Sequence, residues 1–180
     1  MKGVVFTEFF EMVEEIFGYE MVDHIIEETN LESNGIYTAV GTYDHSEIVS
    51  LVVALHKKSE IPVSQLLEKF GHHLYGTFSK NYPNLIEGAD TAFDMLSSIE
   101  DHIHVEVKKL YPDAQLPHFQ IERKDDQHLV MIYRSDRKMA DLAYGLINAC
   151  LDSYATEAEV TKTLLDEEGS LVRFEIVKTN

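Results

Sequence analysis

The sequence of 180 residues is poor in cysteine and has no long apolar run. Its single cysteine, Cys150, cannot form an internal disulfide and fits a reducing cytoplasm, where we expect the protein to be. No run of about 18 apolar residues occurs, so no transmembrane helix is predicted. Glu8 and Glu11 interrupt the first apolar segment, which is atypical of a signal peptide.

Positive charge is scarce as well. The 15 Lys and Arg residues are outnumbered by 32 Asp and Glu residues, which gives a net charge of −17. Because nucleic acids and anionic membranes attract proteins through clustered cations, neither is expected as a partner. Adjacent acidic residues such as Glu14 and Glu15 cannot face each other across a substrate, so they predict solvated surface rather than a catalytic pair.

Recognisable catalytic and metal-binding motifs are missing too. The nine histidines form no His-Glu-x-x-His motif, and no Cys-x-x-Cys motif or glycine-rich phosphate loop occurs. The chain carries no kinase or cyclase motif of its own. We therefore expect neither enzymatic activity nor a structural zinc site.

Apolar periodicity predicts an α+β fold. Spacings of three and four residues predict helices at 2–17, 20–28, 46–58, 63–79, 90–112 and 139–154. Apolar runs bounded by acidic turns predict strands at 116–123, 128–133, 158–165 and 171–178. The chain would then have a helical N-terminal part of about 110 residues and a smaller part with an antiparallel sheet.

The predicted helix 90–112 carries two histidines, His102 and His104, and should end before Pro112. The two side chains leave the helix in different directions, so they cannot share one small metal site. His104 lies at the margin of the apolar stripe that faces the core. A half-buried histidine with an ordinary hydrogen-bond partner is the alternative to a metal ligand, and periodicity alone does not choose between the two residues.

A second feature lies where the strand 128–133 ends. Tyr133, Ser135 and Arg137 alternate, so in an extended segment their side chains project to the same side. Two hydroxyls and a guanidinium make a compact binding group for a carboxylate. The alternative is a strand-end tyrosine beside a surface arginine. A histidine ligand and a carboxylate-binding group are together what haem requires, for its iron and its propionates.

These residues are similar to those of the haem nitric oxide/oxygen binding (H-NOX) family, the bacterial relatives of the sensor domain of soluble guanylate cyclase. The Tyr-x-Ser-x-Arg motif of the family is intact as Tyr133, Ser135 and Arg137. The residues around His104 resemble the context of the proximal histidine, so the resemblance assigns iron ligation to His104. Further similar segments are Met1-Lys2-Gly3, Phe70-Gly71, Leu110-Tyr111-Pro112 and Leu116-Pro117.

The resemblance covers all 180 residues and implies one domain, 1–180, with haem b between two lobes. A helical lobe is expected at about 1–60 and haem-enclosing helices at about 61–112. The sheet-containing lobe, with four antiparallel strands and a long helix, is expected at about 113–180. Pro117 is implied as a packing contact of the haem.

The resemblance also bears on which gas is bound. Family members that hold oxygen stably have a tyrosine seven residues after the motif serine, and here that position is Leu142. The other gas-side positions it implies are Val5, Phe9, Leu74, Phe78 and Leu146. Bound oxygen gathers negative charge and needs a hydrogen-bond donor, so the chain is expected to sense nitric oxide and carbon monoxide, with little stable oxygen binding. Tyr75 or Tyr144 would supply a donor if its hydroxyl entered the pocket.

Nitric oxide binding is implied to release His104 from the iron and so to free the helix 90–112. A separate protein, such as a histidine kinase or a cyclic-di-GMP enzyme, would receive the signal, and a monomer is expected. Three alternatives stay open. They are an oxygen-binding haem sensor, a haem enzyme such as a peroxidase with a distal His and Arg, and an interaction module without a cofactor.

Overall fold

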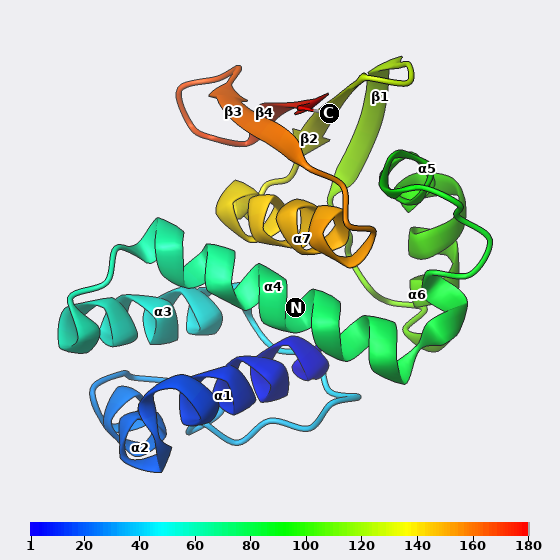
Figure 1. The fold of residues 1–180 in the computed structure, drawn as a ribbon. Coiled ribbons are helices and arrows are strands. Elements are labelled where there is room, and N and C mark those ends of the chain that lie inside the picture. Colours follow the sequence, from blue (N-terminus) through cyan, green and yellow to red (C-terminus); the bar gives the residue numbers. More distant parts are fainter. Residues whose placement is uncertain (180) are drawn as a thin grey trace.

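The computed structural model describes residues 1–179 and places a helical part before a sheet that one long helix covers (Figure 1). The helical part contains α1 (Gly3–Phe17), α2 (Tyr19–Glu27), α3 (His45–Ser59), α4 (Val63–Asn81), η1 (Pro83–Leu85), α5 (Ala92–Ser97), η2 (Ile99–Ile103) and α6 (His104–Leu110). The C-terminal part contains β1 (His118–Lys124), β2 (His128–Arg134), α7 (Ala140–Ser153), β3 (Ala158–Leu164) and β4 (Leu171–Lys178). The predicted α+β class is confirmed. None of the helices in the described range is long and apolar enough to span a membrane.

The four strands form one antiparallel sheet in the order β1-β2-β4-β3. In this register Tyr133 of β2 is paired with Phe119 of β1 and Val172 of β4. All three side chains are buried and belong to a cluster that the apolar face of α7 completes. Because residues 135–139 connect β2 directly to α7, the end of β2 is fixed beside the start of that helix.

Helices α4 and α7 cross at very short distance, and two glycines make this possible. A Cβ atom on Gly71 would lie 2.4 Å from the carbonyl oxygen of Leu142, and one on Gly145 would lie 2.1 Å from that of Glu68. Only glycine permits such a close approach of two backbones. The crossing places α4 between the helices α1 and α3 on one side and α7 on the other (Figure 1).

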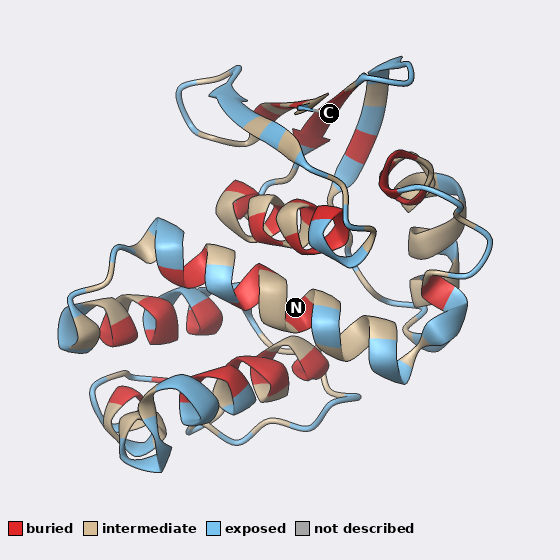
Figure 2. Cartoon of the chain, viewed as in Figure 1, coloured by how far each residue is buried: buried red, intermediate tan, exposed pale blue. Residues whose placement is uncertain are grey.

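Buried apolar residues form two clusters on the two sides of this crossing. One lies among α1, α2, α3 and α4, and the other joins α5, α7 and the sheet. Figure 2 shows the buried residues on the facing sides of the helices and on the sheet strands next to α7. The expected division of the chain near residues 60 and 112 stays a prediction.

The prediction of one regular helix over residues 90–112 is wrong in its middle. Between α5 and α6 the backbone forms η2, a π-helical turn, in which the amide of His104 donates to the carbonyl of Ile99. The hydroxyls of Ser97 and Ser98 donate to carbonyls one turn back, Ser97 to Phe93 at 2.6 Å, and so compete with regular helix bonds. Single π turns often occur at functional sites, and this one ends at His104.

Candidate functional site

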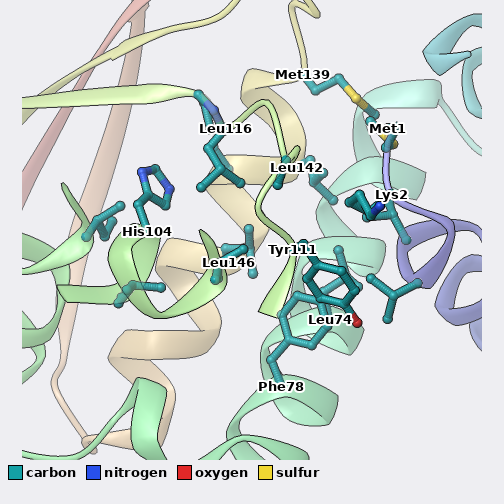
Figure 3. Close-up of a pocket in the computed structure, with 18 of the residues that line it drawn as sticks. Met1, Lys2, Leu74, Phe78, His104, Tyr111, Leu116, Met139, Leu142 and Leu146 are labelled. Carbon is teal, nitrogen blue, oxygen red and sulfur yellow. The ribbon is translucent and has the colours of Figure 1, made fainter. Parts of the chain in front are cut away.

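A cavity of about 630 Å³ opens between α4, α7 and the segment from α5 to β1. This volume falls within the range of roughly 300–1,000 Å³ typical of cofactor pockets. Most of the lining side chains are apolar, and Figure 3 shows Leu74 and Phe78 of α4 together with Leu142 and Leu146 of α7. His104 of α6 lies on the same cavity (Figure 3). A few polar groups in an apolar cavity are what a cofactor site requires.

His104 is held in place by an acidic partner. Its side chain is 14% exposed, and its Nδ1 atom lies 3.2 Å from Oε1 of Glu100. Burial lowers the pKa of His104, and the Glu100 carboxylate opposes this effect. Glu100 is itself positioned by the backbone amide of Phe119, which donates to it at 2.7 Å. The arrangement favours a neutral imidazole, the form that ligates metals, with Nε2 left for a ligand role.

The second histidine of this segment lies elsewhere. The Nε2 atom of His102 is 2.9 Å from the carbonyl oxygen of Asn84, and His102 does not line the cavity. The structure therefore places His104 on the cavity and His102 away from it.

The three residues of the Tyr-x-Ser-x-Arg motif all line the cavity. The Tyr133 hydroxyl is buried and accepts a hydrogen bond from the amide of Met139 at 3.2 Å. Burial raises the pKa of Tyr133, so its hydroxyl keeps its proton and acts as a donor. The Arg137 guanidinium donates to the backbone oxygen of Gln115 at 2.8 Å and to its side-chain oxygen at 3.3 Å. A guanidinium has five N–H donors, so this contact leaves several for an anionic group.

All but one of the gas-side positions that the family resemblance implied line the cavity. Val5, Leu74, Phe78, Leu142 and Leu146 line the cavity, as does the expected packing residue Pro117. Phe9 does not, because its fully buried ring packs edge-on against Phe70 in the core of the N-terminal helices. Phe9 shares a face of α1 with Val5 but lies one turn further along the helix, where its ring is enclosed by the core instead of the cavity.

Tyr75 and Tyr144, the two tyrosines considered as donors, do not direct their hydroxyls into the cavity. The Tyr75 ring lines the cavity, but its hydroxyl is 2.7 Å from Oγ of Ser153. Burial raises the pKa of Tyr75 to about 12. The Tyr144 hydroxyl is directed to the Val160 carbonyl of β3, and Tyr144 is not a lining residue.

Sequence reasoning missed Glu100 and Lys2. Glu100 lies four residues before His104, a spacing that could have indicated a side-chain contact. Lys2 lines the cavity and pairs with Asp113 at 3.1 Å. Lys2 and Asp113 are far apart in the sequence, so no local pattern could have predicted their ion pair.

The comparisons with known proteins agree with this geometry. The model of the Haem-NO-binding family matches residues 2–162. The chain belongs to the H-NOX family. Its structure matches that of the Fe(II) unliganded H-NOX protein from K. algicida with a TM-score of 0.96 and 42% identity, covering 100% of this chain and 97% of that one. No protein in the curated collection matches the chain.

Two further H-NOX structures are similar. The H-NOX from Shewanella woodyi, solved with IWP-051 in the Fe(II)CO ligation state, is 39% identical over 99% of this chain and 95% of that chain, with a TM-score of 0.83. The H-NOX protein from S. oneidensis in the Fe(II)NO state has a TM-score of 0.91. Its identity is 22% over the full length of both chains, so it supports the fold alone.

The residues on the cavity fit haem, the group that the family binds. A neutral imidazole suits iron ligation, and a motif with two hydroxyls and a guanidinium suits carboxylates. The apolar walls from α4 and α7 suit the porphyrin faces. This H-NOX chain is therefore a haem-binding gas-sensor domain.

Proposed function

We propose that the cavity holds haem b and that His104 would ligate its iron. Tyr133, Ser135 and Arg137 bind the propionates, and Pro117 packs against the macrocycle. The support for this assignment is that all five residues line one cavity. His104 also carries the acidic partner that haem-ligating and other metal-ligating histidines typically have.

We further propose that the domain senses nitric oxide and carbon monoxide and holds little oxygen. Bound ferrous haem supplies the position where the gas binds. The chain supplies the surroundings of the gas, and the nominated positions Val5, Leu74, Phe78, Leu142 and Leu146 have no hydrogen-bond donor in their side chains. This absence of a donor is the observation that carries the proposal, because oxygen depends on a donor much more than the other two gases do.

The signal would leave the site through α6. His104 is the first residue of α6 and directly follows the π turn η2, so its side chain is joined to a segment whose hydrogen bonding is already irregular. We infer that release of His104 shifts the balance between two positions of α6, which a separate signalling protein reads. As the receiver we propose a histidine kinase or a cyclic-di-GMP enzyme, the partners that the family resemblance implies. The net charge of −17 favours a basic face on that protein.

The decisive experiment is the absorption spectrum of the ferrous protein, recorded without oxygen and then with each gas. Nitric oxide and carbon monoxide should each change the haem bands, whereas air should leave the haem unligated or oxidise it slowly. A stable oxygen complex would contradict the selectivity proposal, and the absence of any haem band in protein expressed with adequate haem would contradict the whole assignment. Steady turnover of hydrogen peroxide would favour the peroxidase alternative instead.

A further inference from the structure

A second group of metal-binding side chains lies between α1 and α4, outside the haem cavity. Glu8 and Glu11 of α1 and His73 of α4 present ligand atoms that all lie within 4.8 Å of one another. None of the three lines the haem cavity. The two helices pack side by side here (Figure 1).

The pattern of α1 explains why the acidic residues gather there. Glu8, Glu11 and Glu15 are spaced by three and four residues, so they share one face of the helix. Both ring nitrogens of His73 contact carboxylates on this face. Its Nε2 atom lies 3.1 Å from Oε2 of Glu8, and its Nδ1 atom lies 3.6 Å from Oε2 of Glu15.

Glu8 is the unusual member of the group because it is buried. It is 7% exposed, and Glu47 is the other buried charged residue among those the structure describes. Glu47 accepts hydrogen bonds from the hydroxyls of Ser33 and Tyr37, whereas the side-chain partner of Glu8 is His73. Across residues 1–179, no lysine or arginine nitrogen lies within ion-pair distance of Glu8. A buried carboxylate is costly unless a cation accompanies it.

We propose that Glu8, Glu11 and His73 bind one zinc ion that joins α1 to α4. Zinc takes mixed histidine and carboxylate ligands at about 2.0–2.2 Å, so two ligand atoms of a tetrahedral site are roughly 3.3 Å apart. The separation of 3.1 Å between His73 and Glu8 is already close to that value. A rotation of the exposed Glu11 side chain brings the third ligand into range, and water takes the fourth position.

Glu15 is placed to orient the His73 ring without ligating the ion itself. In metal sites the ring nitrogen that does not ligate the ion usually donates its hydrogen to a carboxylate, which fixes the orientation of the ring. Glu15 lies on the Nδ1 side of His73, opposite the ligating Nε2. The sequence predicted no zinc site because the ligands come from two helices that are about 60 residues apart, with no short motif.

The experiment is equilibrium dialysis of the haem-loaded protein against zinc buffers after treatment with EDTA, followed by metal analysis that reports zinc and iron together. Wild-type protein should take up one zinc per chain. The variants His73→Gln and Glu11→Gln should need at least about tenfold more free zinc for the same occupancy. The variant His72→Gln is the control for nonspecific binding to histidines, because His72 lies about 100° around the helix from His73 and is not in the group of ligand atoms, and it should bind zinc as the wild type does.

Two readouts protect this test from trivial results. An unchanged haem spectrum and an unchanged circular dichroism spectrum show that each variant is folded. Glu11 is exposed, so the protein should tolerate its replacement even if replacement of the buried Glu8 prevents folding. Zinc X-ray absorption should show one imidazole among oxygen ligands. Equal zinc uptake by the wild type and His73→Gln, or a zinc environment with several imidazoles, would overturn the proposal.

Discussion

The Nδ1 atom of His104 lies 3.2 Å from the carboxylate of Glu100, one turn earlier in the chain. Glu100 belongs to the π turn η2 and His104 directly follows it, so this contact spans an irregular part of the helix. Glu100 is further held by the amide of Phe119 on β1 and lies 3.2 Å from Nδ1 of His118. The proposed iron ligand is therefore positioned by the sheet as well as by its own helix.

The first prediction concerns this acidic partner. A hydrogen bond from the imidazole to a carboxylate increases the basicity of the ligating nitrogen. Glu100→Gln keeps an acceptor for Phe119 but removes the charge, so it should weaken the bond between His104 and iron and accelerate haem loss about tenfold. Resonance Raman spectroscopy of the ferrous protein should show a lower iron–histidine stretching frequency. Glu106→Gln, on α6 but paired with Lys109, is the matched control and should change neither quantity.

The second prediction distinguishes the two histidines. His104→Gly should abolish haem binding or leave a site that added imidazole restores, because an external imidazole can take the vacated ligand position. His102→Gly removes only a contact with the carbonyl of Asn84, so it should retain the wild-type spectrum. Haem loss in the His102 variant together with an unchanged His104 variant would reverse the assignment.

The third prediction concerns the proposed propionate contacts. Hydrogen bonds to charged groups contribute about 1.5–3 kcal/mol, so Arg137→Ala should accelerate haem transfer to an acceptor protein by about ten- to a hundredfold. Arg134→Ala is the control, because Arg134 is exposed and does not line the cavity. Equal transfer rates in both variants would argue that Arg137 serves only its contact with Gln115.

The fourth prediction tests the apolar wall. Leu142→Tyr introduces a hydroxyl at a cavity-lining position of α7. A donor to bound oxygen should stabilise the complex by about 1–3 kcal/mol, or roughly one to two orders of magnitude in affinity. Leu142→Phe has nearly the same size without the hydroxyl and should remain free of oxygen. Oxygen binding by both variants would trace selectivity to cavity shape rather than to hydrogen bonding.

The sequence predicted most of the fold because the helical stripes and strand alternation are local signals. Tyr133, Ser135 and Arg137 were identified for the same reason, since their alternation is visible over five residues. The π turn before His104 could not be predicted, because it replaces a regular helix without any proline or glycine in residues 99–103. Phe9 was placed on the cavity by resemblance, and its true position depends on how α1 crosses α4, which no local pattern specifies.

The last prediction concerns the crossing of α4 and α7, which brings two cavity walls together. Gly71→Ala would place a methyl group 2.4 Å from the Leu142 carbonyl oxygen, so the helices must separate, at a cost of about 1–3 kcal/mol in the free energy of unfolding. Gly76→Ala, on the same helix, has open space around it and should instead stabilise the protein by up to about 1 kcal/mol. Urea unfolding of the haem-loaded variants measures both effects. Because Leu142 belongs to the cavity, Gly71→Ala should also change the rate of carbon monoxide binding, whereas Gly76→Ala should not. Equal stability of the two variants would show that α7 can shift away without loss, and that the close contact is not what fixes the cavity wall.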